Sequence, residues 1–470
     1  MFFPCKPRVS TLKLSVILIL LIAAPAAGQT SYSLKDCLNL ARQRHPRIQL
    51  QHFQTVQAEE LSKAARTEFL PKLEAGYSYT YRDKINSYDI DGLSFPANTH
   101  DLYNLDITLT QPLFTGFKIM EKYRLAQLGI KQARAEEELA YLEITYETVA
   151  AYFNYLKQLK FAETATRTVA RLESQAHDSQ LFFDNELIPL NDLLYSKVKL
   201  SQAQQQQRRV ETAVLLSRAQ LATIIQIDRD SLFAVDDEPT QATMPFSLEK
   251  ATAIALSRRP ELSLANFAIA SAGHQIKLAQ SDYYPSLYLQ ATHSRMGDKF
   301  TVDGDGLTST PYNTFVSIGA TWKLWEWDRS GHQVRNARAE LEGASQTLKQ
   351  VEDEIALEIK NNFTNAATSY SNIATAAEEV KLGKENYRVT KLRYQNQLST
   401  ATEVLDSQAA LTEAEASYYN ALYEYNIQLA ALARAAGVDS WQSINTSEPA
   451  AISEKSAADR SQAESQTPAR

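Results

Sequence analysis

The sequence predicts a mainly α-helical protein with a β-barrel part, built from a helix–β-hairpin–helix module that occurs twice. Three observations lead to this fold class. The chain of 470 residues contains only 14 glycines, which in an Ala-, Leu-, Gln- and Glu-rich sequence favours long helices over loops. The two halves align with each other, and each half combines two segments of alternating polarity with one long helical stretch.

The composition excludes several classes of protein. With 44% hydrophobic residues, the chain can bury a core, so whole-chain disorder is excluded. Its net charge of −7 and pI of about 5.7 exclude a basic nucleic-acid footprint as its main activity, and we expect no nucleic-acid partner. Two cysteines cannot by themselves form a disulfide framework or a zinc site.

Residues 1–28 are predicted to be a secretory signal peptide. Lys6, Arg8 and Lys13 precede a short apolar run at 14–24, and small residues follow it, which is the pattern of such signals. The run is shorter than the roughly 20 residues of a transmembrane helix. No later segment is long and apolar enough either, so we expect any insertion into a membrane to use β-strands.

The rest of the chain contains an internal duplication. Ser33-Leu34 aligns with Ser247-Leu248, and Leu70-Pro71 aligns with Tyr284-Pro285 at the same offset; further on, the alignment continues after a slip of three residues. An offset of about 210 residues is too long for a solenoid unit and indicates duplication of one large module. A polar, Ser/Ala/Glu-rich tail follows and is expected to be disordered. The predicted parts are a first repeat at 29–228, a linker at 229–245, a second repeat at 246–440 and the tail at 441–470.

Each module begins with a helix and continues into two segments with a period of two. In the first such segment Leu73, Tyr77 and Tyr81 share one face, with polar residues between them. Strands of about ten residues with an apolar outer face and a polar inner face are typical of outer-membrane barrels. Alternation alone also fits a hairpin that lies on a soluble core. The predicted strands are 72–84 and 102–115 in the first repeat, and 286–296 and 312–325 in the second.

Three tryptophans cluster at the end of the fourth predicted strand: Trp322, Trp325 and Trp327. Tryptophan is enriched where a membrane meets water. We therefore interpret these side chains as membrane-interface anchors rather than as a ligand cage.

Long helices are predicted at about 118–183 and about 330–396. In the first, Leu139, Leu142 and Tyr146 begin a series of apolar residues three and four apart, which is a coiled-coil seam. At about 1.5 Å per residue, each helix would be a rod about 100 Å long, which no globular domain needs. Shorter helices follow each rod and are expected to pair antiparallel with its end.

Four strands per chain cannot close a membrane barrel, which needs roughly eight or more. Open strand edges cannot face lipid. If these hairpins enter a membrane, several chains must share one barrel, and a ring symmetry follows.

Similar residues follow each long helix. The first copy reads Phe183-Asp184-Asn185-Glu186-Leu187 with Asp192-Leu193-Leu194 after it, and the second reads Tyr394-Gln395-Asn396-Gln397-Leu398 with Glu403-Val404-Leu405-Asp406 after it. Together with the signal peptide and the duplicated module, these residues show that the whole mature chain resembles the TolC-like outer-membrane efflux protein family. That family has an aromatic residue, Gly-Leu, and then Asp-Val-Leu or Asp-Leu-Leu at this turn. Glu186 and Gln397 stand where the family usually has glycine.

The resemblance implies a homotrimer in which each chain contributes four strands to a 12-stranded outer-membrane barrel that continues into a long periplasmic α-helical coiled-coil tunnel. It implies a place in the outer membrane of a Gram-negative bacterium, in contact with outer-membrane lipid and extending into the periplasm. The implied function is the exit duct of a tripartite efflux or type I secretion system. The implied partners are a periplasmic adaptor (membrane fusion protein) and an inner-membrane pump of the RND, ABC or MFS type.

The resemblance also implies a gate at the periplasmic tip. Glu403 and Asp406 are three residues apart and therefore share a helical face; the resemblance places that face at the entrance, where threefold symmetry would make two carboxylate rings. Such a pore constriction would favour cations. Taken alone, the pair also fits a solvated helix surface.

Two further sets of tip residues come from the resemblance. Asp192 and Tyr394 fall where family members link the two tip coiled coils by hydrogen bonds, and a basic partner is expected at Ser399, which cannot supply it. The tip turns are expected at Glu186, Leu187, Gln397 and Leu398.

A second hypothesis is a non-conducting coiled-coil tether between envelope layers. A tether needs neither strands with polar inner faces nor paired carboxylates at the distal turn, so both features favour the duct. No nucleophile–base pair, metal-ligand spacing or phosphate-binding loop can be identified in the sequence. We therefore expect no enzymatic activity, no metal site and no cofactor.

Overall fold

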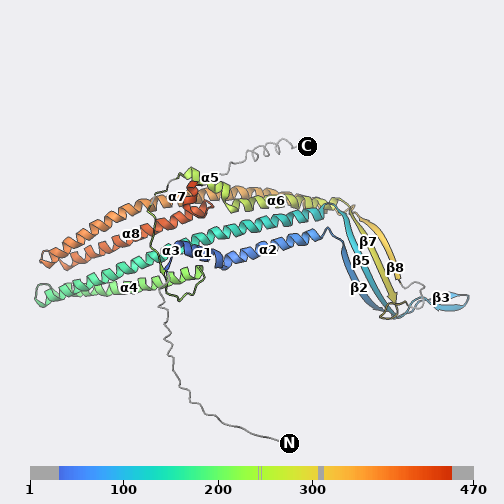
Figure 1. The fold of residues 1–470 in the computed structure, drawn as a ribbon, viewed down its shortest axis with the longest axis horizontal. Helices are drawn as coiled ribbons and strands as arrows, with labels where there is room; N and C mark the ends of the chain where they lie inside the picture. Colours follow the sequence, from blue (N-terminus) through green and yellow to red (C-terminus); the bar gives the residue numbers. More distant parts are fainter. Residues whose placement is uncertain (1–30, 242, 245, 305–311, 447–470) are drawn as a thin grey trace, which may run out of the picture.

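The computed structural model describes residues 31–446 except 242, 245 and 305–311. The predicted signal peptide and the predicted tail from 447 onward lie outside the described residues. Long helices run side by side along the molecule, and a β-sheet continues from one of their ends (Figure 1). Among the described helices, none combines the length and the apolarity that crossing a membrane requires.

The two repeats contain the same elements in the same order, which confirms the predicted duplication. Helices α3 and α7 both have 67 residues, and α4 and α8 both have 35. The first repeat comprises α1 (Leu34–Arg44), α2 (Pro46–Thr67), β2 (Lys72–Tyr81), β5 (Asp101–Thr115), α3 (Lys118–Asp184) and α4 (Leu190–Ile224). The second comprises α5 (Leu248–Arg258), α6 (Pro260–Gln280), the short 3₁₀ helix Ser281–Tyr283, β7 (Ser286–Gly297), β8 (Tyr312–Thr321), α7 (Arg329–Gln395) and α8 (Ala401–Ala435).

Equivalent local signals begin the helices of each repeat. Ser33 caps α1 and forms a capping box with Asp36, while Ser247 caps α5 through the backbone N–H of Lys250. Pro46 and Pro260 occupy the first position of α2 and α6, where the missing N–H has no helical partner to lose.

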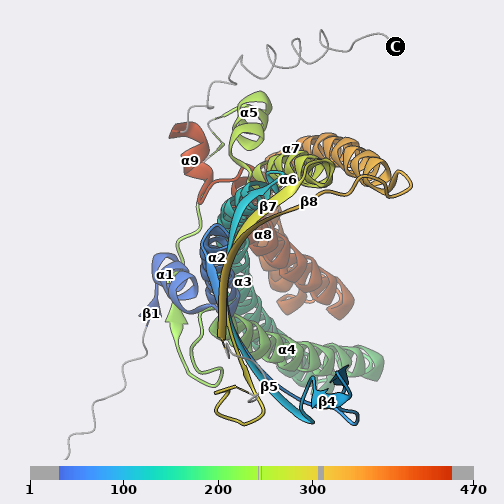
Figure 2. The same ribbon diagram turned by 90° about the vertical axis from the view of Figure 1, so that its right-hand side faces the viewer.

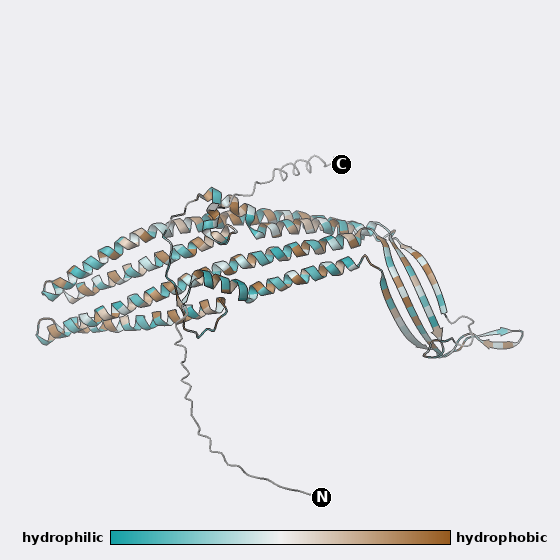
Figure 3. Cartoon of the chain, in the orientation of Figure 1, coloured by the Kyte–Doolittle hydropathy of each residue, from teal (hydrophilic) through white to brown (hydrophobic). Residues whose placement is uncertain are grey.

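The sheet has the strand order β2-β5-β7-β8, and all its neighbours are antiparallel. Its register places Leu73 opposite Leu109, which in turn lies opposite Ala291. Apolar residues therefore share one face and polar residues the other, and the two colours alternate along the strands in Figure 3. Strands β2 and β8 end at Tyr81 and Thr321, earlier than predicted, because their pairing partners in β5 and β7 begin there.

An additional hairpin, β3 (Ser87–Ile90) and β4 (Leu93–Pro96), lies in the loop between β2 and β5 (Figures 1 and 2). Its turn residues, Asp91 and Gly92, have φ of 51° and 84°, as a type I′ turn requires. The Asp-Gly dipeptide is the sequence signal for this hairpin, which was not predicted.

The stretch predicted as a linker is bound to both repeats. It contains β6 (Ala234–Val235), which pairs with β1 (Ser31–Tyr32). The Tyr152 hydroxyl of α3 donates to the Asp236 carbonyl at 2.6 Å, and the Tyr423 hydroxyl of α8 donates to Asp237 at 2.7 Å. The linker is therefore a strap across α3 and α8.

The start of the predicted tail is ordered rather than disordered. Residues 441–446 form helix α9 (Trp441–Thr446), and Ile444 is fully buried. Ile444 packs into the apolar cluster of α5, α7 and α8. Burial of this apolar side chain stabilises the short helix within an otherwise polar stretch, which explains why the start of the tail is ordered.

A chain of ion pairs crosses the middle of the molecule. Arg259, only 5% exposed, pairs with Glu261 and Glu358. Glu358 of α7 also pairs with Arg434 of α8, whose guanidinium lies 3.6 Å from Glu143 of α3. Because α3 belongs to the first repeat and α7 and α8 to the second, these pairs join the repeats.

We expect Glu261 to stabilise the protein in a pH-dependent way. Burial acts to raise the pKa of Glu261, but the hydrogen bonds and charge of Arg259 outweigh it and hold this pKa below the ordinary value of 4.5. A lowered folded-state pKa gives stability above the unfolded value that is lost as the pH falls through the folded value. Glu261→Gln should therefore destabilise the protein at neutral pH, and the difference from wild type should shrink below about pH 4.5.

Denaturation of the detergent-solubilised protein between about pH 7 and about pH 3 measures this difference. Glu211→Gln, on an exposed part of α4, is the matched control. A difference at Glu261 that stays constant into acid would contradict the expectation.

Candidate functional site

The candidate site is the end of the helical part farthest from the sheet (Figure 1). Here α3 turns into α4 to complete the first coiled coil, and α7 turns into α8 to complete the second. The sequence places its candidate gate residues in these turns and in the adjoining helical ends.

The two tip turns have the same hydrogen-bonded geometry. After α3, the N–H of Glu186 donates to the Phe183 carbonyl at 2.9 Å and that of Leu187 to Phe182 at 2.8 Å. After α7, Gln397 and Leu398 repeat both bonds at 2.8 Å. This pattern is a Schellman motif, which ends a helix with one residue in the left-handed conformation.

Glu186 and Gln397 are those left-handed residues, with φ of 58° and 61°. A residue with a Cβ is strained there by roughly 1–2 kcal/mol, whereas glycine is not. The following side chains, Leu187 and Leu398, are 50% and 68% exposed. Both turns therefore present an apolar side chain to solvent on a strained backbone.

Tyr394 lies at the centre of the tip. It is only 2% exposed, and its ring centroid lies 5.2 Å from that of Phe182. Its hydroxyl shares a hydrogen bond of 3.1 Å with Ser179 of α3, which shares another of 3.0 Å with Ser196 of α4. Burial raises the pKa of Tyr394, so its hydroxyl keeps its proton. Tyr394 thus joins the second coiled coil to the first.

The structure brings Asp192 near Tyr394 but gives it a different contact from the one predicted. The Tyr394 hydroxyl bonds to Ser179, and Asp192 instead accepts the Ser196 hydroxyl on its backbone carbonyl at 3.1 Å. The Asp192 carboxylate lies in the first turn of α4, where Pro189 offers no capping side chain. A carboxylate is stabilised at that end by the helix dipole and the exposed N–H groups. No sequence pattern singles out Ser179, because serine is ordinary on a coiled-coil helix.

Glu403 and Asp406 lie on one exposed face of α8, with the buried Val404 and Leu405 between them. Glu403 belongs to the helix cap: its N–H donates to the Thr400 hydroxyl at 3.2 Å. Its carboxylate accepts the hydroxyl of Ser399, the position where a basic residue was expected. In one chain the two carboxylates therefore face solvent and are free of any ion pair among the described residues.

The predicted membrane-interface tryptophans lie between the sheet and the helices. Trp322 directly follows β8, and its indole N–H donates to the Tyr283 carbonyl at 3.1 Å. Trp325 and Trp327 pack edge to face at 5.7 Å. All three are exposed in the single chain, at the end of the sheet opposite the β3–β4 hairpin.

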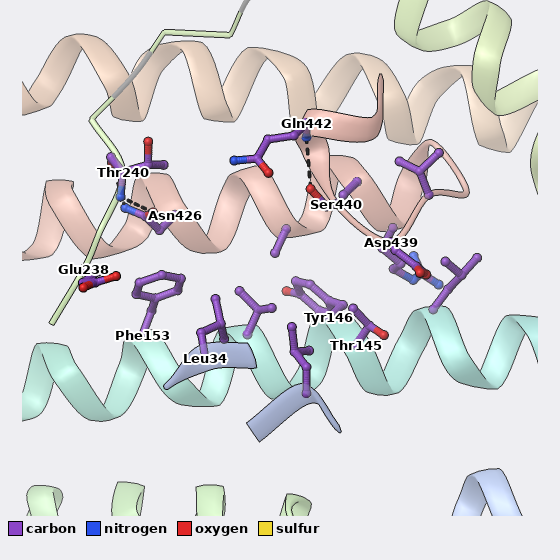
Figure 4. Close-up of a pocket in the computed structure, with 17 residues that line it drawn as sticks. Leu34, Thr145, Tyr146, Phe153, Glu238, Thr240, Asn426, Asp439, Ser440 and Gln442 are labelled. Carbon is purple, nitrogen blue, oxygen red and sulfur yellow. Dashed lines mark hydrogen bonds between the residues drawn. The ribbon is translucent and has the colours of Figure 1, made fainter. Parts of the chain in front are cut away.

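A cavity of about 240 Å³ lies in the middle of the molecule, where α1, α3, α8 and the linker meet. Figure 4 shows Phe153 of α3 opposite Asn426 of α8, and Tyr146 of α3 opposite Ser440. Asn426 exchanges hydrogen bonds of 3.0 and 3.1 Å with the backbone of Thr240. The lining of the cavity combines apolar side chains such as Leu142 with polar ones such as Asp439. Across the described part of the chain, His, Cys, Asp and Glu form no group of three or more placed to hold a metal ion.

The chain is similar to known proteins of the bacterial outer membrane. The model of the family described as "Outer membrane efflux protein" matches residues 37–225 and 252–438. The chain is 23% identical over 432 residues to the outer membrane protein TolC of Escherichia coli (strain K12), covering 87% of this chain and 84% of that protein. It is 26% identical over 201 residues to protein CyaE of Bordetella pertussis, covering 43% of this chain and 42% of that protein.

Solved structures share the fold. The outer membrane protein VceC of Vibrio cholerae superposes with a TM-score of 0.72 at 17% identity, covering 86% of this chain and 96% of that chain. The CmeC outer membrane channel of Campylobacter jejuni superposes with a TM-score of 0.73 at 15% identity, covering 92% and 94%.

Glycine at either tip turn should stabilise the protein. Glu186→Gly or Gln397→Gly removes the strain of a Cβ at positive φ, and the entropy that glycine adds to the unfolded chain offsets only part of this gain. We expect each substitution to increase the free energy of unfolding by about 0.5–1 kcal/mol, measured by thermal or denaturant unfolding. Glu186→Ala and Gln397→Ala keep the Cβ and should give no such gain. Equal effects of alanine and glycine would show that strain is not the cause.

Proposed function

The chain belongs to the outer membrane efflux protein family, and on this premise we propose that it is the exit duct of a tripartite efflux or type I secretion system. Members of this family are efflux channels of the Gram-negative outer membrane that extend into the periplasm, and they are transport proteins rather than enzymes.

The main support for a duct is that the four-stranded sheet has two open edges. Within the described residues, β2 and β8 each pair with a strand on one side only. An open edge cannot face lipid, because its N–H and C=O groups would lack partners. Pairing β2 of one chain with β8 of the next satisfies both edges. Three chains then form a closed 12-stranded barrel, with the polar faces inside.

The helices extend the same ring into the periplasm. Viewed along the long axis, they lie on an arc, with α1, α5 and α9 on its convex side (Figure 2). Three such arcs related by the axis of the barrel enclose a tunnel. The convex side is the outside of the tunnel in this homotrimer.

The tip is the proposed gate. Threefold symmetry turns Glu403 and Asp406 into two rings of carboxylates around the entrance, which favour cations and repel anions. The Tyr394–Ser179 hydrogen bond holds the second coiled coil against the first in each chain. Opening requires the coiled coils to move apart and therefore breaks this bond.

The proposed partners are a periplasmic adaptor and an inner-membrane pump of the RND, ABC or MFS type. A passive duct takes its direction and energy from a pump. The exposed Leu187 and Leu398 at the tip turns are the apolar contacts offered to the adaptor.

Single-channel recording in a planar bilayer tests the duct and its constriction. Purified wild-type trimers should form cation-selective pores, and Glu403→Ala/Asp406→Ala should lower that selectivity because both carboxylate rings disappear. Glu413→Ala, another exposed glutamate on α8, should leave selectivity unchanged. Pores indifferent to the double substitution would place the constriction elsewhere. Inserted, folded trimers that form no pore would support the tether and overturn the duct.

Tyr394→Phe should loosen the gate. It removes the hydroxyl that bonds to Ser179 while keeping the packing against Phe182. A buried hydrogen bond contributes about 1 kcal/mol to stability, so its loss from the closed state should raise the ratio of open to closed channels about fivefold. The measurement is conductance without an adaptor, with Ser179→Ala as a second variant and Tyr88→Phe in the β3–β4 hairpin as control. Unchanged conductance in both tip variants would exclude this bond as a gate contact.

A further inference from the structure

We propose that Glu415 of α8, together with Arg167 and Arg171 of α3, forms a second gate contact above the tip that sets how readily the duct opens. These three residues are called the Glu415 cluster below. The proposal rests on the proposed function as a gated duct, and it adds residues that neither the sequence pattern nor the tip geometry identifies.

The Glu415 cluster joins the two coiled coils directly. Glu415 is only 4% exposed, and its carboxylate lies 3.4 Å from the Arg171 guanidinium and 3.7 Å from that of Arg167. Arg171 also lies over the Tyr387 ring of α7, 5.9 Å from its centroid. Among the described residues, these are the two ion pairs between the coiled coils in the part of α3 that runs from residue 160 to the tip. Both coiled coils are therefore needed to neutralise Glu415.

The seam around the Glu415 cluster is polar, in contrast to the seam inside the second coiled coil. Between α7 and α8, Ile373, Tyr425 and Leu429 form an apolar cluster. Between the coiled coils, several buried polar atoms have no hydrogen-bond partner within the described chain. They are Arg167 Nε, Arg171 Nη1, Gln175 Oε1, Asp178 Oδ2, Gln408 Oε1 and Glu415 Oε2.

This contrast determines where the helical part can separate. When water enters an apolar seam, the apolar side chains of that seam lose their hydrophobic stabilisation. Water entering the polar seam gives partners to groups that lack them. The attraction within a buried ion pair is also largely offset by the desolvation of its charges, so hydration releases the pair at modest cost. The coiled coils therefore separate along this seam while each stays intact.

The Glu415 cluster also supplies a charged contact that the tip lacks. Ser399 stands where a basic residue was expected, and its hydroxyl bonds to Glu403 on the same chain segment. Glu415 lies twelve residues after Glu403 on α8, about 18 Å along the helix axis. The charged contact of this gate thus lies within the coiled coils rather than at the entrance.

Glu415→Gln tests the contact by removing its charge at nearly constant shape. Arg171 then loses its carboxylate partner in the closed seam and Arg167 keeps only Glu163 of its own helix, whereas the open seam leaves both arginines hydrated. In planar bilayers without an adaptor, we expect the open fraction to rise about tenfold. The matched control is Glu413→Gln, two residues away on the exposed side of α8, which should behave as wild type.

A disulfide across the same seam tests the opposite direction. The hydroxyls of Thr168 and Thr412 are 3.0 Å apart, so the side chains at these positions touch across the seam, as a disulfide between cysteines there requires. Oxidised Thr168→Cys/Thr412→Cys should lose conductance, and reductant should restore it. Each single cysteine variant is a control, and the native Cys37 is fully buried.

The outcomes separate this proposal from the proposed function. Equal conductance of Glu415→Gln and Glu413→Gln, or an oxidised double-cysteine channel that still opens, overturns the second gate contact while wild-type pores still support the duct. Wild-type trimers without pores overturn the duct itself. If Glu415→Gln fails to assemble, the double-cysteine variant decides, because in its reduced form the Glu415 cluster is intact.

Discussion

An open sheet edge has no stable place in lipid, and the rest of this structure follows from that constraint. One chain supplies four amphipathic strands whose outer members, β2 and β8, each lack a neighbour. The missing hydrogen bonds have to come from other copies of the chain, so several chains share one barrel. The helices that continue from the strands then follow the same rotational symmetry as the barrel. Helices of 67 residues then become the walls of a tunnel rather than isolated rods. In the proposed duct, the pair of carboxylates on the surface of α8 becomes two rings at the entrance.

The strength of the contacts between the two repeats differs along the molecule. In the middle, the linker binds α3 and α8, and Arg259, Glu358 and Arg434 connect the helices through shared ion pairs. Toward the tip, many contacts between the coiled coils are polar, apart from the packing of Phe182 against Tyr394, and the tip turns hold two non-glycine residues at positive φ. The proposed gate needs a fixed middle and a separable end, because the tip then opens while the two repeats of each chain stay joined. The linker and the shared ion pairs therefore join the repeats in the middle of the molecule, away from the proposed gate.

The differences between expectation and structure share a physical origin. Tyr394 was expected to bond to Asp192, but its hydroxyl reaches Ser179, because the register of α3 against α7 decides which small polar residue faces the ring. Residues 441–446 read as a polar tail, yet Ile444 fills a site on the core and orders a short helix. Arg167 and Glu415 look like ordinary surface charges of a coiled coil. They form an ion pair, with Glu415 buried, only because two helices more than 240 positions apart in the sequence lie side by side.

The sequence by itself determined the local elements and their repetition. Periods of two and of three to four residues set the strands and the long helices, the proline and serine signals set helix starts, and the alignment of the halves set the duplicated order. These properties depend on neighbours within one or two turns, so they can be read along the chain. The tertiary structure alone decided which side chains meet across the seam: Ser179 with Tyr394, Asp237 with Tyr423, and Arg171 with Glu415. Such pairs depend on the axial register and rotation of helices that pack against each other, and a periodic pattern leaves both undetermined because shifting by one turn preserves it.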